Sequence, residues 1–205
     1  MRKDEDEKMY AYIKGELEEK SNGFIVIENN GIGYKIFMSN TAIGRLGELH
    51  SEVKVYTYYQ VREDNISLYG FNTKEELRMF ELLISVSGVG SKSAINMLSN
   101  IEASSFAVAV VSNDIKKISS IKGIGNKTAQ RLVLELKDKL KAEQELTKME
   151  EAKEVESEEE ISSDAVDALQ ILGYTRKDIE VVLKKLDTTN LSTEEIIKQA
   201  LKYLS

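Results

Sequence analysis

The sequence predicts an α+β protein made of several small domains in a row, and three observations support this prediction. Residues 9–71 alternate apolar and polar side chains between turn signals, as short strands do. Residues 72–141 change to a helical period and contain one short pattern twice. Residues 142–160 are acidic and nearly free of large apolar groups, which is typical of a flexible linker whose start can be helical. The alternative interpretation of this segment is a self-inhibitory mimic of DNA charge. The 205 residues suffice for one large domain or for two to three small ones.

Five strands and one short helix are predicted in the first domain, residues 9–71. The strands are expected at residues 10–17, 24–27, 32–38, 53–61 and 66–71, and the helix at 41–46. A hairpin turn is expected at Asn29-Asn30-Gly31, because these residues accept positive φ angles. Five short strands with one helical insert fit a small OB-type barrel. Residues 1–8 are expected to be a charged extension with nothing to bury.

The second domain, residues 72–141, repeats one pattern at a constant offset of 35 residues, from Gly88 to Gly123. Each copy has a Gly-x-Gly turn after an apolar run, then a lysine and an alanine at matching positions of a helical pattern. This is the pattern of a helix-hairpin-helix. Its glycines allow positive φ angles and a close approach to phosphate, and the next helix offers unpaired N–H groups and a positive dipole end. The sequence therefore predicts a tandem module that binds the DNA backbone without reading bases.

The predicted backbone-binding residues belong to the two turns and to the helix starts behind them. They are Gly88, Val89, Gly90, Ser91, Lys92, Gly123, Ile124, Gly125, Asn126, Lys127, Thr128 and Arg131. The net charge of −7 is unevenly distributed along the chain. Residues 74–141 hold 11 Lys and Arg against 7 Asp and Glu, a balance of +4, whereas residues 141–160 hold 3 Lys against 9 Glu, a balance of −6. Because phosphate contacts depend on the local field, the total charge does not exclude DNA.

An acidic turn, Arg62-Glu63-Asp64-Asn65, is expected between the last two strands of the barrel. Adjacent carboxylates at a hairpin tip point in different directions, so they do not converge on one metal ion or act as an acid–base pair. An ordinary polar turn is one interpretation, because Asp and Asn are favoured there. In a protein that binds phosphate elsewhere, Glu63 and Asp64 beside Arg62 would instead repel the DNA backbone from one spot.

The third domain, residues 161–205, is predicted to be a compact three-helix, UBA-like domain. Gly173 ends its first helix, and Ser192 with Glu195 forms a capping box at the start of the third. Because the domain has no basic stripe, we expect it to bind a protein rather than DNA. The apolar residues expected near that docking surface are Leu172, Tyr174 and Ile179.

Several kinds of chemistry are not expected. A Walker A loop needs a glycine directly before its lysine, and Ser91 and Asn126 occupy that position, so no ATP binding is predicted. With one histidine, His50, in a polar loop and no cysteine, no metal site, disulfide or cofactor is expected. No long apolar run and no signal-peptide core are present, so a cytoplasmic protein is expected. Because none of the catalytic patterns above is found, we expect this protein to be non-catalytic.

The order of these domains resembles the RuvA family of Holliday junction branch-migration subunits from Met9 to Ser205. The resemblance is carried by residues 61–71 (VREDNISLYGF), 88–92 (GVGSK) and 123–132 (GIGNKTAQRL). It implies a homotetramer that holds a four-way junction open on a flat basic face, with Glu63 and Asp64 as an acidic pin at the junction centre. One tetramer or two on opposite sides of the junction are both compatible with the sequence.

The resemblance also implies partners. These are four-way junction DNA, the hexameric ATPase motor RuvB, bound through the third domain and stimulated in branch migration, and the junction resolvase, in recombination, DNA repair and the SOS response. Ser91 stands where the family often has proline, and Asn126 where a second lysine is common. We therefore expect a softer phosphate grip at both turns.

Two other functions compete with this interpretation. A helix-hairpin-helix glycosylase or nuclease would need a base pocket with a catalytic Lys or Asp, and Asp138 is interpreted as surface of a charged helix end. A single-stranded DNA binder would use Tyr56, Tyr58 and Tyr59 as stacking platforms. Strand alternation places Tyr59 on the opposite face from the other two tyrosines, so at least part of this cluster is expected in the barrel core.

Overall fold

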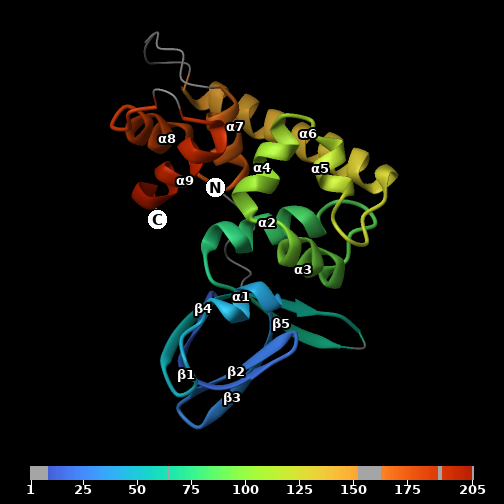
Figure 1. The fold of residues 1–205 in the computed structure, drawn as a ribbon, viewed down its shortest axis with the longest axis vertical. Coiled ribbons are helices and arrows are strands. Elements are labelled where there is room, and N and C mark those ends of the chain that lie inside the picture. Colours follow the sequence, from blue (N-terminus) through green and yellow to red (C-terminus); the bar gives the residue numbers. More distant parts are fainter. Residues whose placement is uncertain (1–8, 64, 152–162, 189–190, 205) are drawn as a thin grey trace. The chain divides into compact units, whose positions relative to one another are not determined.

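The computed structural model describes residues 9–63, 65–151, 163–188 and 191–204, without the side chains of 140–151 and 163. The predicted N-terminal extension therefore lies outside the described residues. The chain divides into two compact units, Met1–Phe80 and Glu81–Ser205. Figure 1 shows strands in the first and helices in the second. The predicted helix-hairpin-helix domain is divided between the two units, and its part from Glu81 onward falls within one compact unit with the C-terminal domain.

The first unit contains a closed five-stranded barrel in the order β1-β2-β3-β5-β4. All neighbouring strands pair antiparallel except β3 and β5, which are parallel. The predicted OB-type barrel and its short helix are confirmed, with small shifts at the ends of elements. The bounds are β1 Tyr12–Ser21, β2 Phe24–Asn29, β3 Ile32–Phe37, α1 Asn40–Gly44, β4 Glu52–Val61 and β5 Ile66–Phe71.

The barrel core is made of alternating apolar side chains, because inward and outward positions alternate along a strand. Leu17, Ile25, Ile27, Ile36 and Val55 are fully buried there. The helix α2 (Lys74–Ile84) packs against β4 and β5 through Phe80, whose ring lies 4.9 to 5.4 Å from the rings of Phe71, Tyr58 and Tyr69. Full burial of such a side chain contributes roughly 2–3 kcal/mol to folding.

The second unit begins with the end of α2 and continues through α3 (Ser91–Asn100), α4 (Ala103–Val111), α5 (Ile115–Ser119) and α6 (Asn126–Glu151). The helix α6 runs past residue 142, so the first part of the predicted acidic linker is helical and continues α6. The rest of that linker lies outside the described residues. No single described helix is long and apolar enough to cross a membrane, and α3 with α4 passes that test only as a pair bent by 96°.

The C-terminal domain has the three predicted helices, α7 (Ser163–Ile171), α8 (Arg176–Leu183) and α9 (Thr193–Leu204). The predicted capping box at α9 is confirmed, because the Ser192 N–H donates to Glu195 Oε2 at 2.9 Å and the Glu195 N–H donates to Ser192 Oγ at 3.3 Å. Gly173, with φ 98°, ends α7 as expected.

The C-terminal domain packs on α4 through α7 and α9. Seven of the nine residues of α4 are buried, and small side chains such as Ala103 and Ala107 permit close approach. Two polar contacts join the same surfaces: Ser105 Oγ donates to Glu194 Oε1 at 2.8 Å, and Lys198 Nζ lies 3.5 Å from Glu102. The sequence showed that α4 is apolar but not what covers it.

Candidate nucleic-acid interface

The first hairpin turn connects α2 to α3 and is closed by its own backbone. The Val89 N–H donates to the Val86 carbonyl at 3.0 Å, and Gly88 has a φ of 86°. An L side chain rarely adopts this angle, which explains the glycine. Val86 and Val89 are buried on the inner side of the turn, whereas Gly88 and Gly90 are exposed. Apolar residues therefore anchor the turn while its glycines face outward.

The second turn connects α5 to α6 and has the same geometry. The Ile124 N–H donates to the Ile121 carbonyl at 3.0 Å, and Gly123 has a φ of 90°. The helices behind the turns also start alike, because the Ala94 N–H donates to Gly90 at 2.9 Å and the Ala129 N–H to Gly125 at 3.0 Å. The repeat in the sequence is thus a repeat in structure.

The twelve predicted backbone-binding residues divide by exposure. Val89, Ser91 and Ile124 are 7%, 3% and 6% exposed, so their side chains hold the turn in place and do not face a ligand. The N–H groups of Val89 and Ile124 are used inside the turns and are not available to phosphate. Thr128 is half-buried. The exposed members are Gly88, Gly90, Lys92, Gly123, Gly125, Asn126, Lys127 and Arg131.

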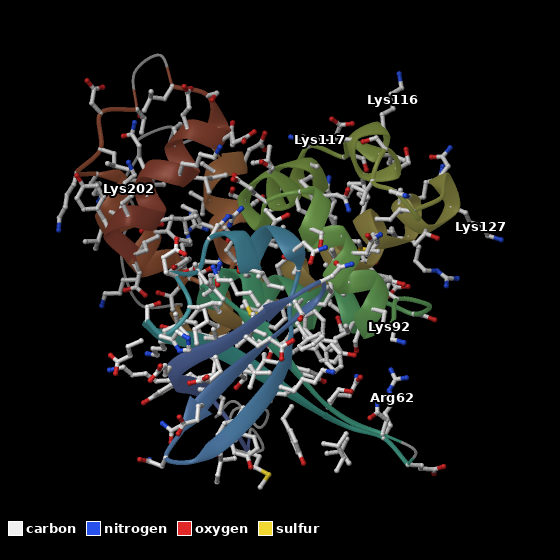
Figure 2. The ribbon with its side chains drawn as sticks, turned by 60° about the horizontal axis from the view of Figure 1, so that its bottom comes forward. Arg62, Lys92, Lys116, Lys117, Lys127 and Lys202 are labelled. Atoms are coloured by element: carbon white, nitrogen blue, oxygen red, sulfur yellow. The ribbon has the colours of Figure 1, made fainter. Side chains whose placement is uncertain are left out.

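Each turn leads into a helix start that suits an anion. Gly90 is the N-cap of α3 and no side-chain hydrogen bond caps that end. The early N–H groups of a helix and its dipole favour negative charge there. Lys92 and Lys127, one residue into α3 and α6, project outward from the ribbon in Figure 2. Lys116 in α5 also points outward, and the sequence reasoning did not include it in the site.

Arg131 differs from the prediction of a simple phosphate contact. Its Nη1 donates to the Ser87 carbonyl at 3.2 Å, and its Nε lies 3.7 Å from Glu135. The sequence reasoning missed Asn96, whose Nδ2 donates to the Lys122 carbonyl at 2.7 Å. These bonds cross between the two motifs, and sequence spacing alone gives no sign of them.

The acidic turn lies at the tip of the hairpin between β4 and β5. Arg62 and Asn65 exchange backbone hydrogen bonds, with the Arg62 N–H donating at 2.9 Å and the Asn65 N–H at 3.4 Å. Arg62 and Glu63 are exposed. Asp64 lies outside the described residues, so the arrangement of the predicted pin stays a prediction.

The tyrosines of β4 are engaged in packing. Tyr59 packs against the barrel core, and the ring of Tyr58 lies 5.2 Å from that of Phe80. Lys54 Nζ lies 4.9 Å from the ring centre of Tyr56. Tyr58 and Tyr59 therefore do not form an open stacking platform for bases.

His50 lies on the barrel surface with two carboxylates. Its Nδ1 is 3.0 Å from Glu16 and 4.0 Å from Glu18, and all three residues are exposed. Among the described residues this is the one group whose spacing could suit a metal ion. A surface ion pair accounts for the same spacing.

In the C-terminal domain, two of the three predicted docking residues are core. Leu172 is 3% exposed and Ile179 is fully buried, so neither side chain can contact a partner in this structure. These apolar residues beside the Gly173 turn thus belong to the core of the three-helix domain, and a docking surface near them stays a prediction. Tyr174 is half-buried. The large apolar side chains of this domain that are well exposed include Val181 and Tyr203, at 49% and 67%.

The fold and these two turns define a class of protein: a closed OB-type barrel joined to a tandem helix-hairpin-helix. The RuvA N-terminal domain family matches residues 9–70, the SAM-like helix-hairpin-helix tandem family matches residues 80–138, and the RuvA C-terminal domain family matches residues 160–205.

Three similar relatives are each named Holliday junction branch migration complex subunit RuvA. The protein of Acetivibrio thermocellus is 50% identical over 201 residues, covering 96% of this chain and 99% of its own. That of Ruminiclostridium cellulolyticum is 46% identical over 200 residues, covering 96% and 100%. That of Clostridium tetani is 42% identical over 196 residues, covering 96% and 99%. The chain belongs to the RuvA family.

Proposed function

We propose that this protein is the DNA-binding subunit of a branch-migration complex and holds four-way junctions by their sugar–phosphate backbone. The observation that carries the proposal is the pair of hairpin turns, which share one backbone geometry and each lead into a lysine-bearing helix start. The names of the relatives, which describe a Holliday junction branch migration complex subunit, support the junction as the substrate.

The turns supply affinity that does not depend on sequence, because phosphate oxygens are the same along every strand. The acidic turn, in which Arg62 and Glu63 are exposed, supplies the preference for DNA shape. A carboxylate repels phosphate, so Glu63 and Asp64 disfavour a continuous duplex at their position and tolerate the open centre of a junction. Four copies of the chain would place four such turns around that centre.

The test compares affinity for a four-way junction, a duplex and a single strand of equal length at one salt concentration. We expect the order junction, duplex, single strand. The double variant Glu63→Gln with Asp64→Asn keeps the turn but removes its charge, so duplex affinity should rise about threefold or more while junction affinity is retained. Glu48→Gln, another exposed barrel carboxylate, is the matched control. A double variant with an unchanged preference for junctions would show that the acidic residues form only a polar turn.

We further propose that the C-terminal domain binds the motor ATPase RuvB and that this domain does not contact the junction DNA. Val181 on α8 is exposed and apolar, as a protein-docking residue needs to be. The variant Val181→Asp in the full chain should leave junction affinity unchanged and lower the ATP-driven branch migration that RuvB performs. Full stimulation of RuvB by this variant would mean that the docking surface does not include Val181. Loss of junction binding would mean that the domain belongs to the DNA site.

A further inference from the structure

Two side chains cross between the hairpin motifs in a symmetric way. Asn96 of α3 donates from Nδ2 to the carbonyl of Lys122, in the second turn, at 2.7 Å. Arg131 of α6 donates from Nη1 to the carbonyl of Ser87, in the first turn, at 3.2 Å. Both the donors and the acceptors are separated by the repeat offset of 35 residues. One contact is therefore made twice, each time from the helix of one motif to the turn of the other.

Each donor contacts the residue one helical turn later. Asn100 Nδ2 donates to the Asn96 backbone carbonyl at 2.6 Å and also to Asn96 Oδ1 at 3.4 Å, and Glu135 Oε1 lies 3.7 Å from Arg131 Nε. Asn100 and Glu135 are again 35 residues apart. The chemistry differs while the positions correspond, because the first pair is two neutral amides and the second is an ion pair. Glu135 Oε2 also accepts from the Ser87 N–H at 3.4 Å, so the ion pair holds Ser87 at two points.

The crossing side chains lie over the turn glycines. A Cβ placed on Gly88 would lie 3.8 Å from Arg131 Nη1, and one placed on Gly123 would lie 3.5 Å from Asn96 Nδ2. Apart from the glycine's own chain neighbours, the atom nearest to such a Cβ thus comes from the opposite motif.

The peptide plane gives these bonds a consequence for phosphate binding. The Ser87 carbonyl and the Gly88 N–H belong to one trans peptide and point in opposite directions. A donor that fixes the carbonyl therefore also fixes the direction of the N–H on the other side. The Lys122 carbonyl and the Gly123 N–H are related in the same way. Each crossing side chain thus sets the orientation of a glycine N–H in the opposite turn.

We propose that Asn96 and Arg131 are positioning residues that join the two turns into one rigid, two-site phosphate grip, each orienting the turn of the opposite motif. The proposal rests on the proposed binding of DNA backbone by these turns. On this basis Arg131 acts mainly through Ser87, although the sequence alone placed it among the phosphate ligands.

The test is a set of double-mutant cycles on the full chain, measured as junction affinity. Asn96→Ala and Arg131→Ala are each combined with Lys92→Ala and with Lys127→Ala. Loss of one such hydrogen bond should weaken binding about threefold to tenfold. Residues that act through one element couple, while independent residues add. We therefore expect Asn96→Ala to couple with Lys127→Ala and Arg131→Ala to couple with Lys92→Ala, and the other two combinations to be additive.

Copying the Asn96–Asn100 pair to positions 131 and 135 separates an effect of positioning from an effect of charge. Arg131→Asn with Glu135→Asn reproduces the Asn96–Asn100 pair and should recover most of the affinity lost in Arg131→Ala with Glu135→Ala. The Arg131→Ala variant should also keep the salt dependence of binding, because no phosphate contact is lost. A drop of about 1 in the log–log salt slope with no recovery by asparagine would make Arg131 a direct phosphate ligand and overturn its positioning role.

Asn96, the uncharged one of the two donors, gives an independent check of the positioning role. Asn96→Asp keeps the size of the side chain but turns an acceptor toward the Lys122 carbonyl, so it should weaken binding at least as much as Asn96→Ala. Equal thermal unfolding midpoints would exclude loss of folding as the cause. If Lys92→Ala and Lys127→Ala leave binding unchanged, the proposed function fails. If they weaken binding but do not couple with Arg131→Ala and Asn96→Ala as expected, only the positioning role of Asn96 and Arg131 fails.

Discussion

The two hairpin turns share one backbone but differ in the charge around it. Gly88 and Gly123 have φ angles of 86° and 90°, and both turns are closed by a hydrogen bond of 3.0 Å. The first turn has Ser87, with a Glu135 carboxylate at its N–H. The second has an exposed lysine, Lys122, at the position that matches Ser87.

This difference teaches that geometry and charge are set by separate residues. Glycines and buried apolar side chains fix the path of the turn, and these are alike in both motifs. The exposed positions are free to vary, and they make the second turn more basic. Backbone substitutions should therefore act equally at the two turns, whereas charge substitutions should act unequally.

The largest effect is expected from the turn glycines. An alanine forced to a positive φ costs about 1–2 kcal/mol or shifts the turn, so Gly88→Ala and Gly123→Ala should each lower junction affinity on the order of tenfold. Neither new methyl group meets an atom closer than 3.5 Å, so conformation rather than collision is responsible. Affinity is measured for junctions with different arm sequences, and the loss should be the same for all.

Gly44→Ala is the matched control, because Gly44 lies in α1 with an ordinary φ and open space around its Cα. It should leave binding unchanged. Clearly different losses of affinity for Gly88→Ala and Gly123→Ala would mean that the two turns contribute unequally to phosphate binding despite their shared backbone geometry.

An intermediate effect is expected from the lysines. Lys92→Ala leaves the first turn with the Arg131–Glu135 ion pair, which carries no net charge, whereas Lys127→Ala leaves Lys122 in place at the second turn. The first loss should therefore be the larger, by about threefold. Each variant should lower the log–log salt slope by about 1 per binding subunit, since each lysine displaces roughly one counterion.

Lys177→Ala, an exposed lysine of the C-terminal domain, is the control and should change neither affinity nor slope. A loss restricted to certain arm sequences would contradict backbone binding. A larger loss at Lys127 would show that Glu135 does not weaken the field of the first turn.

The features predictable from the sequence are local ones. The turns, the five strands and the Ser192–Glu195 capping box each depend on residues a few positions apart, so spacing reveals them. The hydrogen bond from Arg131 to Ser87 joins residues 44 positions apart, and the one from Ser105 to Glu194 joins residues 89 positions apart. Such contacts depend on how helices pack, which periodicity does not determine. For the same reason the sequence does not show that the side chains of Leu172 and Ile179 are buried, because an apolar residue beside a turn can face either way.

The smallest effect concerns a contact between the second motif and the C-terminal domain. Lys117 belongs to α5, the first helix of that motif, and lies 3.8 Å from Glu194 of α9. The hydrogen bond from Ser105, together with Lys198 and Lys117, holds the pKa of the Glu194 carboxyl below its ordinary value of 4.5. Because the charged form is the one stabilised, the contact is at full strength above about pH 4.5. It weakens as the pH falls through the lowered pKa.

Glu194→Gln should therefore reproduce at neutral pH what acid does to the wild-type protein. Amide hydrogen exchange of α4 should speed up about twofold to fivefold in the variant, since Glu194 is partly exposed and such contacts are individually weak. Because the intrinsic exchange rate of an amide falls as the pH is lowered, the quantity to compare is the protection factor, which is the intrinsic rate divided by the observed rate. Acidification should lower the protection factors of α4 in the wild-type protein but no longer in the variant. With Lys117 released from its carboxylate, the second turn gains positive field, so junction affinity should rise less than twofold. Protection factors that respond to acid equally in both proteins would remove Glu194 as the group that links the C-terminal domain to the second motif.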